Sequence, residues 1–232
     1  AEMLVMDVCD DARRLNAITI DLETYVDDPK RRSALQAIVA KVNALGLATT
    51  ESGASVLWAL MTPRAMSNFR AVLADGRISK TYHNKAYDST LLKARGFTIR
   101  GEEHCTMLMH HAAFPGMAHG LQVVASQFYV VPPWKADHRN EVETDANHTL
   151  YNIKDAYATA KLVAPLTAIV KRSQTEVIYD LDREMAEYAG MMHMTGCPID
   201  KEISDDIGRR LEVIIGASRK VIDDKADEIH ER

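Results

Sequence analysis

The chain has 232 residues, 47% of them hydrophobic and 26% charged, and its formal net charge is −5. This length supports one substantial core and a small appendage, and no run reaches the roughly 18 apolar residues that a membrane span requires. The acidic N-terminus lacks the basic start and apolar stretch of a signal peptide. We therefore expect a cytoplasmic protein without membrane contact.

Cysteine and histidine do not favour a zinc site or a disulfide framework. The three cysteines are scattered, and the histidines do not form the pairs that zinc sites use. We interpret the histidines in the middle of the chain as helix-surface and loop residues: His104, His110, His111 and His119.

Hydrophobic periodicity and turn residues predict an α/β domain with a mixed sheet flanked by helices. In chain order we expect strands at 17–22, about 40–49 and 54–60, a helix over 62–75, a strand at 79–83, a helix at 86–95 and a short strand before Cys105. Most of the remaining chain is expected to be helical. We interpret 27–39 as an insertion near the mouth of a site, and 130–149 as a loop that packs Trp134.

Two carboxylates follow the first predicted strand, in the segment ITIDLET. Side chains alternate between the faces of a strand, so Asp21 and Glu23 point the same way while Leu22 points to the opposite side. Two ligands of one site would then share a face. An Asp-x-Glu pair alone is more often a solvated strand end.

Asp88 and Asp155 lie on two predicted helices. Asp88 falls in the first turn of its helix, and Asn84 before it is an N-cap residue, a substrate contact, or both. Tyr151 and Asp155 are spaced i, i+4 and share one helix face, as many chance pairs do. The combination is more informative, because 67 residues separate Asp21 from Asp88 and 67 more lead to Asp155.

Four ionised carboxylates in one place require cations. At separations of about 4 to 6 Å, each close pair would cost roughly 4 kcal/mol at an effective dielectric near 20. Oxygen ligands suit Mg²⁺ or Mn²⁺, and two such ions can activate a water and stabilise the leaving oxygen of a displacement at phosphorus. We expect two divalent ions, Mg²⁺ or Mn²⁺, on Asp21, Glu23, Asp88 and Asp155.

These segments resemble the motifs of the 3′-5′ proofreading exonuclease domain of family A DNA polymerases, the bacterial DNA polymerase I type and its phage relatives, within the DEDD superfamily. The matching segments are residues 21–24, 84–88 and 151–155, and the tyrosine that opens the third indicates the tyrosine subclass. Residues 105–129 are also similar to the family, with Cys105 where an aspartate is common. The resemblance implies a ribonuclease H-like fold.

The resemblance also implies roles for the site residues. Asp21, Glu23 and Asp155 would hold one metal ion with the attacking water, and Asp21 with Asp88 would hold the second near the leaving 3′ oxygen. Tyr151 would orient this water and assist its deprotonation. The expected substrate contacts are Leu22, Thr24, Asn84 and Tyr87.

We expect an exonuclease domain at 1–172, followed by a helical segment at 173–232 that looks like the start of a polymerase domain. In this segment a helix ends near Gly196, and a long helix follows. That helix carries an apolar stripe, which we interpret as core packing: Ile203, Ile207, Leu211, Ile214 and Val221. Because no palm or fingers motif follows, we expect no DNA synthesis. The start at Ala1 and the end within a helix favour a piece of a longer polymerase.

We therefore predict an enzyme that hydrolyses the terminal phosphodiester of single-stranded or frayed DNA 3′ ends and releases nucleoside 5′-monophosphates, as in proofreading during DNA replication. Its partners would be a DNA 3′ end and a polymerase domain of the same or a partner chain. Charge permits this, since 1–172 holds 20 basic and 18 acidic residues, whereas 173–232 holds 8 and 15. The alternatives are a ribonuclease D-like RNA exonuclease and an inactive module that binds DNA or scaffolds a polymerase.

Overall fold

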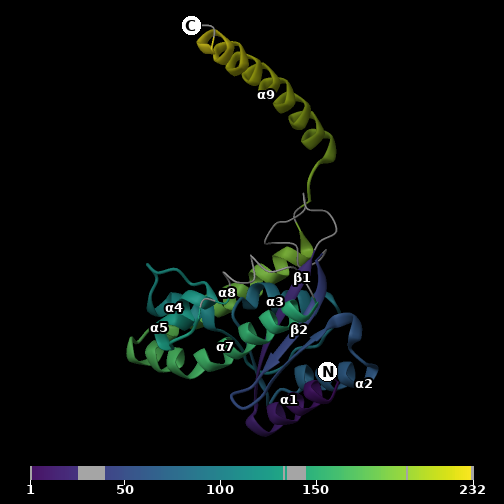
Figure 1. Cartoon of the computed structure of the whole chain (residues 1–232), viewed down its shortest axis with the longest axis vertical. Coiled ribbons are helices and arrows are strands. Elements are labelled where there is room, and N and C mark those ends of the chain that lie inside the picture. Colours follow the sequence, from purple (N-terminus) through teal and green to yellow (C-terminus); the bar gives the residue numbers. More distant parts are fainter. Residues whose placement is uncertain (1, 26–39, 133, 135–144, 197, 231–232) are drawn as a thin grey trace. The chain divides into compact units, whose positions relative to one another are not determined.

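The computed structural model describes residues 2–25, 40–132, 134, 145–196 and 198–230 (Figure 1). These residues form two compact units that divide after Thr195. The first unit holds a sheet and most of the helices, and the second holds the last helix. The insertion predicted at 27–39 lies outside the described residues, as does most of the loop that precedes the third motif.

A five-stranded mixed sheet, in the order β3-β2-β1-β4-β5, forms the centre of the first unit. Its strands are β1 (Ala17–Tyr25), β2 (Lys41–Ala48), β3 (Gly53–Leu57), β4 (Ser79–Tyr82) and β5 (Glu103–Cys105). β1, β2 and β3 pair antiparallel, whereas β4 lies parallel to both β1 and β5. The predicted mixed sheet is confirmed, including the short strand that reaches Cys105.

The third strand, predicted at 54–60, ends earlier than expected, and helical turns follow it. β3 ends at Leu57, and a 3₁₀ turn, η2 (Trp58–Leu60), follows it. α2 (Pro63–Ala74) then begins with a proline in its first position, and the Thr62 hydroxyl oxygen accepts a hydrogen bond from the Ala65 N–H over 3.2 Å. This N-cap and proline account for the predicted helix at 62–75.

The two faces of the sheet are covered by different helices. α7 (Asp145–Arg172) crosses one face, where it contacts β1, β2 and β3 (Figure 1). On the other face Ile20 and Leu22 of β1 join a hydrophobic core with side chains from α1 (Glu2–Leu15) and α2. Side-chain alternation along β1 therefore turns its carboxylates toward α7.

The first helix, α1, was not among the predicted elements. Its buried residues, Val5, Val8, Cys9 and Ala12, have the i, i+3, i+4, i+7 spacing of an amphipathic helix. That spacing was the signal available in the sequence.

Among the described residues, four further helices belong to the first unit: α3 (Lys85–Ala94), α4 (Thr106–Ala113), α5 (Leu121–Phe128) and α8 (Glu176–Thr195). α8 packs against α3 and α4, and it approaches α3 so closely that a Cβ atom on Gly190 would collide with the Thr90 side chain. At the other end of α8, the Tyr179 hydroxyl accepts a hydrogen bond from the Cys105 N–H over 3.3 Å. The compact unit thus runs past the boundary expected at 172 and includes α8.

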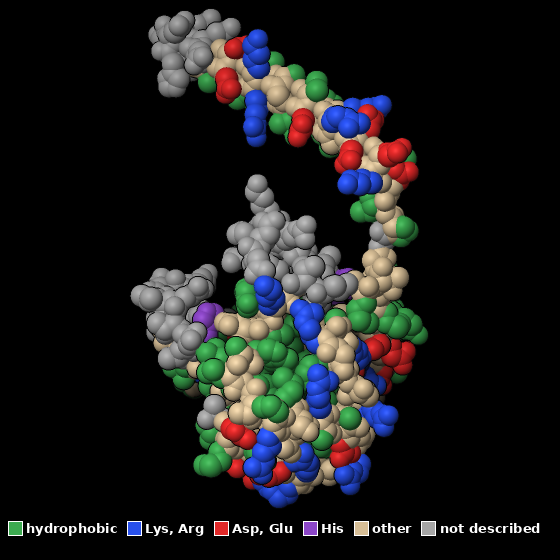
Figure 2. All heavy atoms as spheres, turned by 90° about the vertical axis from the view of Figure 1, so that its right-hand side faces the viewer, with side chains coloured by type: hydrophobic (Ala, Val, Ile, Leu, Met, Phe, Trp, Pro, Cys, Tyr) green, Lys and Arg blue, Asp and Glu red, His purple; other side chains and the backbone are tan. Residues whose placement is uncertain are grey.

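The second unit is built on one helix, α9 (Lys201–His230). α8 stops before Gly196, whose φ of 71° is the left-handed conformation typical of a residue after a helix C-terminus, and the Asp200 carboxylate accepts hydrogen bonds from the N–H groups of Glu202 and Ile203. The predicted long helix is confirmed, but the interpretation of its apolar stripe as core packing is wrong, because the stripe residues are exposed: Ile203, Ile207, Leu211, Ile214 and Val221. Figure 2 shows hydrophobic side chains among acidic and basic ones along this helix.

The interpretation of the histidines as helix-surface and loop residues is wrong for His110, which is fully buried. Its Nδ1 lies 2.7 Å from Nδ1 of His119, and the Nε2 of His119 lies 3.1 Å from Nδ1 of His111. Its own Nε2 lies 3.0 Å from the side-chain oxygen of Gln127. Burial costs little here because both imidazole nitrogens of His110 have hydrogen-bond partners.

Within the described residues, no helix is long and apolar enough to cross a membrane.

Candidate active site

Three carboxylates from two elements meet on the α7 side of the sheet. Asp21 and Glu23 come from β1 and Asp155 from α7, and each offers an oxygen such that all three oxygens lie within 4.8 Å of one another. The Leu22 side chain between them is buried in the core on the opposite face. Strand alternation therefore places the first two predicted ligands on one side of the sheet, and α7 brings the third predicted ligand to them.

The fourth predicted ligand, Asp88, stands beside this group rather than within it. It lies in the first turn of α3 and is buried, and the backbone N–H groups of Leu22 and of Asp88 itself act to lower the pKa of its carboxylate. Burial and the nearby charge of Glu23 nevertheless raise the pKa of Asp88 to about 8.

Asp21 shows the strongest sign of an electrostatically strained cluster. Burial, then the charges of Asp88, Asp155 and Glu23, raise the pKa of Asp21 well above its usual range, and only a hydrogen bond from Asn152 opposes the shift. A group of carboxylates that resists ionisation in this way needs protons or cations. Its oxygen-only donors suit hard divalent ions, so the residues present fit the metals predicted from sequence.

Tyr151 precedes Asp155 by one turn of α7, as the i, i+4 spacing predicted. Its ring is half-buried and packs against a second hydrophobic cluster, which side chains of α4, α5 and α7 form. This packing limits the movement of the Tyr151 ring, which lies on the same helix as Asp155.

Comparison with known proteins identifies the family. The model of the 3′-5′ exonuclease domain of family A DNA polymerases matches residues 1–171. The chain belongs to this family. No curated protein matches it by sequence.

Solved structures share the fold at low sequence identity. Brucella melitensis NrnC, also solved with Mg²⁺ and with pGG, is 18% identical with a TM-score of 0.61, over 78% of this chain and 86% of that one. Escherichia coli RNase D, described as an exoribonuclease involved in structured RNA processing, is 18% identical with a TM-score of 0.61, over 82% and 48%. Pol1 of M. smegmatis, solved with a DNA primer-template and dNTP, is 17% identical with a TM-score of 0.52, over 73% and 27%. The predicted ribonuclease H-like class is thereby confirmed.

In this exonuclease, Asn152 forms a contact that the sequence analysis did not anticipate. Its fully buried amide donates hydrogen bonds to the Asp21 carboxylate over 2.7 Å and to the Asp21 main-chain oxygen over 3.2 Å, and its oxygen accepts one from the Ser55 hydroxyl over 2.7 Å. Asp21, Gly46 and Ser55 lie side by side across three strands. A Cβ atom on Gly46 would come within 2.7 Å of the Asn152 side-chain oxygen. Glycine therefore makes room for the amide that fixes Asp21.

Trp134 forms a second unanticipated contact. Its buried indole N–H donates a hydrogen bond of 2.6 Å to the Asp155 carboxylate. The sequence indicated that this tryptophan packs inward, but nothing local indicated that it would meet a carboxylate 21 positions away. Because the indole occupies one carboxylate oxygen, it also fixes the direction of the other.

The predicted substrate contacts differ in what they expose. Thr24 and Tyr87 hydrogen-bond to each other through their hydroxyl groups over 2.7 Å and are half-buried. Asn84 occupies the N-cap position of α3, yet its side chain makes no capping hydrogen bond and is exposed. The Leu22 side chain lies in the core, away from the carboxylates. Its backbone N–H acts to lower the pKa of Asp88.

Proposed function

We propose that the chain removes nucleoside 5′-monophosphates from DNA 3′ ends in a reaction that depends on two divalent metal ions. The observation that supports this most is the meeting of Asp21, Glu23 and Asp155, with Asp88 beside them. A 3′-5′ exonuclease of the DEDD type is what the family provides. DNA as the substrate and two ions as the cofactor are the further steps of the proposal.

The carboxylates would divide between the two ions. Asp21, Glu23 and Asp155 would hold the first, and Asp21 with Asp88 the second, with Mg²⁺ or Mn²⁺ as the ions that their oxygens suit. Bound there, such ions lower the pKa of a water molecule and stabilise the charge of a leaving 3′ oxygen. The hydrogen bond from Asn152 would hold the Asp21 carboxylate in place, and the one from Trp134 would hold the Asp155 carboxylate in place.

Tyr151 would orient the attacking water. It shares a helix face with Asp155, so the phenol and this carboxylate lie on the same side of α7. Tyr151→Phe keeps the ring and removes the hydroxyl, and we expect kcat to fall by about a hundredfold, the lower end of what a positioned proton acceptor contributes. Tyr188→Phe, at an exposed tyrosine of α8, is the matched control.

Residues 173–232 support DNA rather than RNA, because they resemble the opening of a polymerase domain. The exposed apolar residues of α9 offer a surface for such a domain, in this chain or in a partner. RNA is the second candidate, which the likeness to the exoribonuclease RNase D supports. An inactive module is the third.

One experiment separates these functions. The purified chain is given matched DNA and RNA oligonucleotides with free 3′ ends, in Mg²⁺, in Mn²⁺ and in EDTA, and the products are resolved by length. We expect DNA to shorten stepwise into monophosphates with either ion and to stay intact in EDTA. Preferential loss of RNA would favour the second candidate, and no cleavage of either would favour the third.

The number of ions is tested separately, by calorimetric titration of Mn²⁺ into the metal-free protein. We expect two ions for the parent and one for Asp88→Asn, because Asp88 belongs to the second site alone. A stoichiometry of one in both proteins would contradict the two-ion proposal without affecting the exonuclease assignment.

A further inference from the structure

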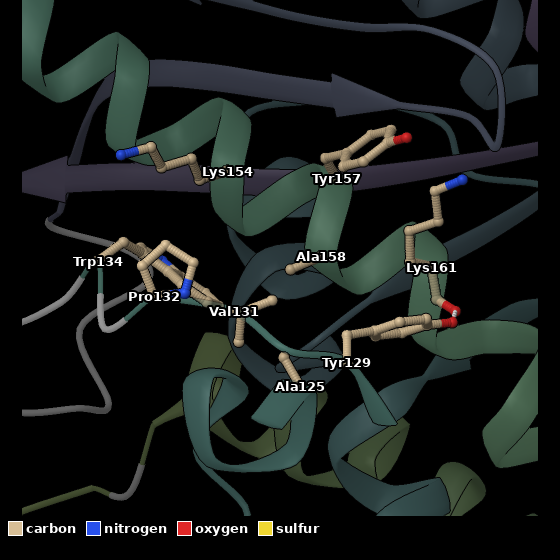
Figure 3. A pocket seen from close by; sticks show the side chains of 9 residues that line it. All are labelled: Ala125, Tyr129, Val131, Pro132, Trp134, Lys154, Tyr157, Ala158 and Lys161. Carbon is tan, nitrogen blue, oxygen red and sulfur yellow. Dashed lines mark hydrogen bonds between the residues drawn. The ribbon is translucent and has the colours of Figure 1, made fainter. Parts of the chain in front are cut away.

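A pocket of about 450 Å³ lies between α5 and α7, next to the carboxylates but outside them. Figure 3 shows its wall of aromatic side chains, with Tyr129 and Trp134 on one side and Tyr157 on α7. Two lysines of α7, Lys154 and Lys161, also border it. This volume falls in the range of pockets that bind small organic groups.

α7 presents these residues as one face. Lys154, Tyr157, Ala158 and Lys161 have the i, i+3, i+4, i+7 spacing, so they line the pocket together. The Lys161 ammonium lies 5.1 Å from the centre of the Tyr157 ring, and the Lys154 side chain is exposed. Two cations thus stand at the edge of an aromatic surface.

A proline fixes the second aromatic wall. Pro165 inside α7 has no N–H, so it leaves the Lys161 carbonyl without its usual helical partner. The Tyr129 hydroxyl donates a hydrogen bond of 2.8 Å to that carbonyl. The Tyr129 ring is therefore anchored across the gap between α5 and α7, although 41% of the residue surface remains exposed.

Trp134 belongs both to this pocket and to the catalytic site. One edge of its indole lines the pocket, while its N–H holds the Asp155 carboxylate at 2.6 Å. A group bound in the pocket would thus lie one side chain away from a metal ligand.

We propose that this pocket binds the base of one nucleotide of the substrate strand, with Lys154 and Lys161 near the strand's phosphates. Any base can stack on tyrosine and tryptophan rings, and lysines at the rim complement a polyanion. The closeness of Trp134 to Asp155 favours a nucleotide covalently continuous with the one at the carboxylates over a free mononucleotide. The inference rests on the proposed function and adds a second point of contact for its substrate.

Binding to uncleaved DNA tests the pocket independently of catalysis. Anisotropy of a labelled short single strand is measured with Ca²⁺ in place of Mg²⁺, for the parent, Tyr157→Ala and Lys154→Ala. Loss of one stacked base commonly weakens binding about tenfold, so we expect that change in Kd for Tyr157→Ala and a smaller, salt-dependent one for Lys154→Ala. Tyr188→Ala and Lys171→Ala, exposed on α8 and at the end of α7, are controls that should bind like the parent. Equal Kd values in all five proteins would overturn the proposal.

An abasic scan identifies the nucleotide that the pocket holds. When one abasic site is moved along the strand, we expect a single position at which the parent weakens to the level of Tyr157→Ala, while Tyr157→Ala itself does not weaken further. Equal losses for both proteins at every position would contradict base binding in the pocket. Binding of a free mononucleotide that Tyr157→Ala abolishes, with strand affinity unchanged, would make it a mononucleotide site instead and would also overturn the proposal.

Cleavage by the same proteins separates this inference from the proposed function. If the parent shortens DNA and Tyr157→Ala does so with the same KM, the pocket proposal fails while the exonuclease stands. If the parent cleaves nothing but binds strands through Tyr157, the proposed reaction fails while the binding site stands.

Discussion

The two sides of α3 handle buried charge in opposite ways. On one side Asp88 joins other carboxylates of the candidate active site, where burial and the neighbouring carboxylates raise the pKa values of Asp21 and Asp88. On the other side Lys93 lies 3.0 Å from Glu103 and 2.5 Å from Glu187, and Lys85 lies 3.2 Å from Glu187. One helix thus separates a cluster of like charges from a cluster of opposite charges.

The contrast indicates which cluster serves stability and which serves binding. Burial alone would raise the pKa of Glu187, but the hydrogen bonds and charges of Lys93 and Lys85 lower it. The α8 side is therefore neutralised by its own residues. Asp88, whose pKa is raised to about 8, has no such compensation from its carboxylate neighbours, and an external cation would supply it.

The largest expected effect is on the carboxylate side. Asp155→Asn keeps an oxygen that can accept the Trp134 hydrogen bond but removes one ligand charge. We expect kcat/KM for 3′ end removal to fall about a thousandfold, as when a transition state loses a key electrostatic partner. Glu187→Gln makes the same chemical change on the α8 side and should keep parental activity. If Asp155→Asn kept more than a tenth of the parental activity, the carboxylate cluster would not have the catalytic importance proposed here.

The metal-free stability of the protein should depend on pH through Asp88. An aspartate has a pKa near 3.9 when unfolded, and this one has a pKa of about 8 in the fold, so the folded state holds the extra proton between these values. The contribution of Asp88 to stability should therefore be fully present at and below pH 4 and be lost as the pH rises through 8.

Urea unfolding in EDTA at pH 5 and pH 8 measures this effect. We expect the parent to lose about 3.5 kcal/mol more than Asp88→Asn over this range, which corresponds to a little under three pKa units. Saturating Mg²⁺ should raise stability at pH 8 more in the parent than in Asp88→Asn, which keeps one of the two proposed ion sites. Parallel pH profiles for the two proteins would mean that Asp88 titrates normally.

Two glycines provide a matched pair across the molecule. A Cβ atom on Gly46 would collide with Asn152, and one on Gly190 would collide with Thr90. Alanine at either position should cost about 2 kcal/mol of unfolding free energy, typical of overpacking. Only Gly46→Ala should also lower kcat at a temperature where both variants are folded. Asn152 hydrogen-bonds to the predicted metal ligand Asp21, whereas the Thr90 side chain beside Gly190 has no such role in the proposal. Equal activity in the two variants would contradict the idea that Asn152 positions Asp21 for the reaction.

The smallest expected effect is on the α8 side. Lys93→Met removes the cation between Glu103 and Glu187, and the exposure of this cluster to solvent limits the loss to about 1 kcal/mol. Thermal unfolding should show a melting temperature lower by about 2 to 4 °C, with exonuclease activity unchanged. An unchanged melting temperature would show that solvent, rather than Lys93, compensates the two glutamates.

Part of this site could be predicted from short stretches of sequence. The common face of Asp21 and Glu23 depends only on strand alternation, and the common face of Tyr151 and Asp155 only on the helical repeat. The position of Asn84 before α3 is likewise local. Each pattern lies within two turns or one strand, so no distant residue is needed to produce it.

The remaining features depended on contacts between distant segments. The Asn152 contact requires the register that sets Gly46 beside Asp21, and the Trp134 contact joins side chains that are 21 positions apart in the chain. Burial of His110 follows from a hydrogen-bond partner nine positions away, and its residue type alone favoured the surface.

Local sequence patterns were enough to predict the strands of the sheet, the faces on which the carboxylates and the tyrosine lie, and the family resemblance that they carry. Contacts between distant segments were needed to show which carboxylates meet, that Asp21 and Asp88 resist ionisation, and that α8 belongs to the first unit. Local periodicity is fixed by covalent geometry within a few residues. Protonation and close approach depend instead on how segments far apart in the chain exclude water between them.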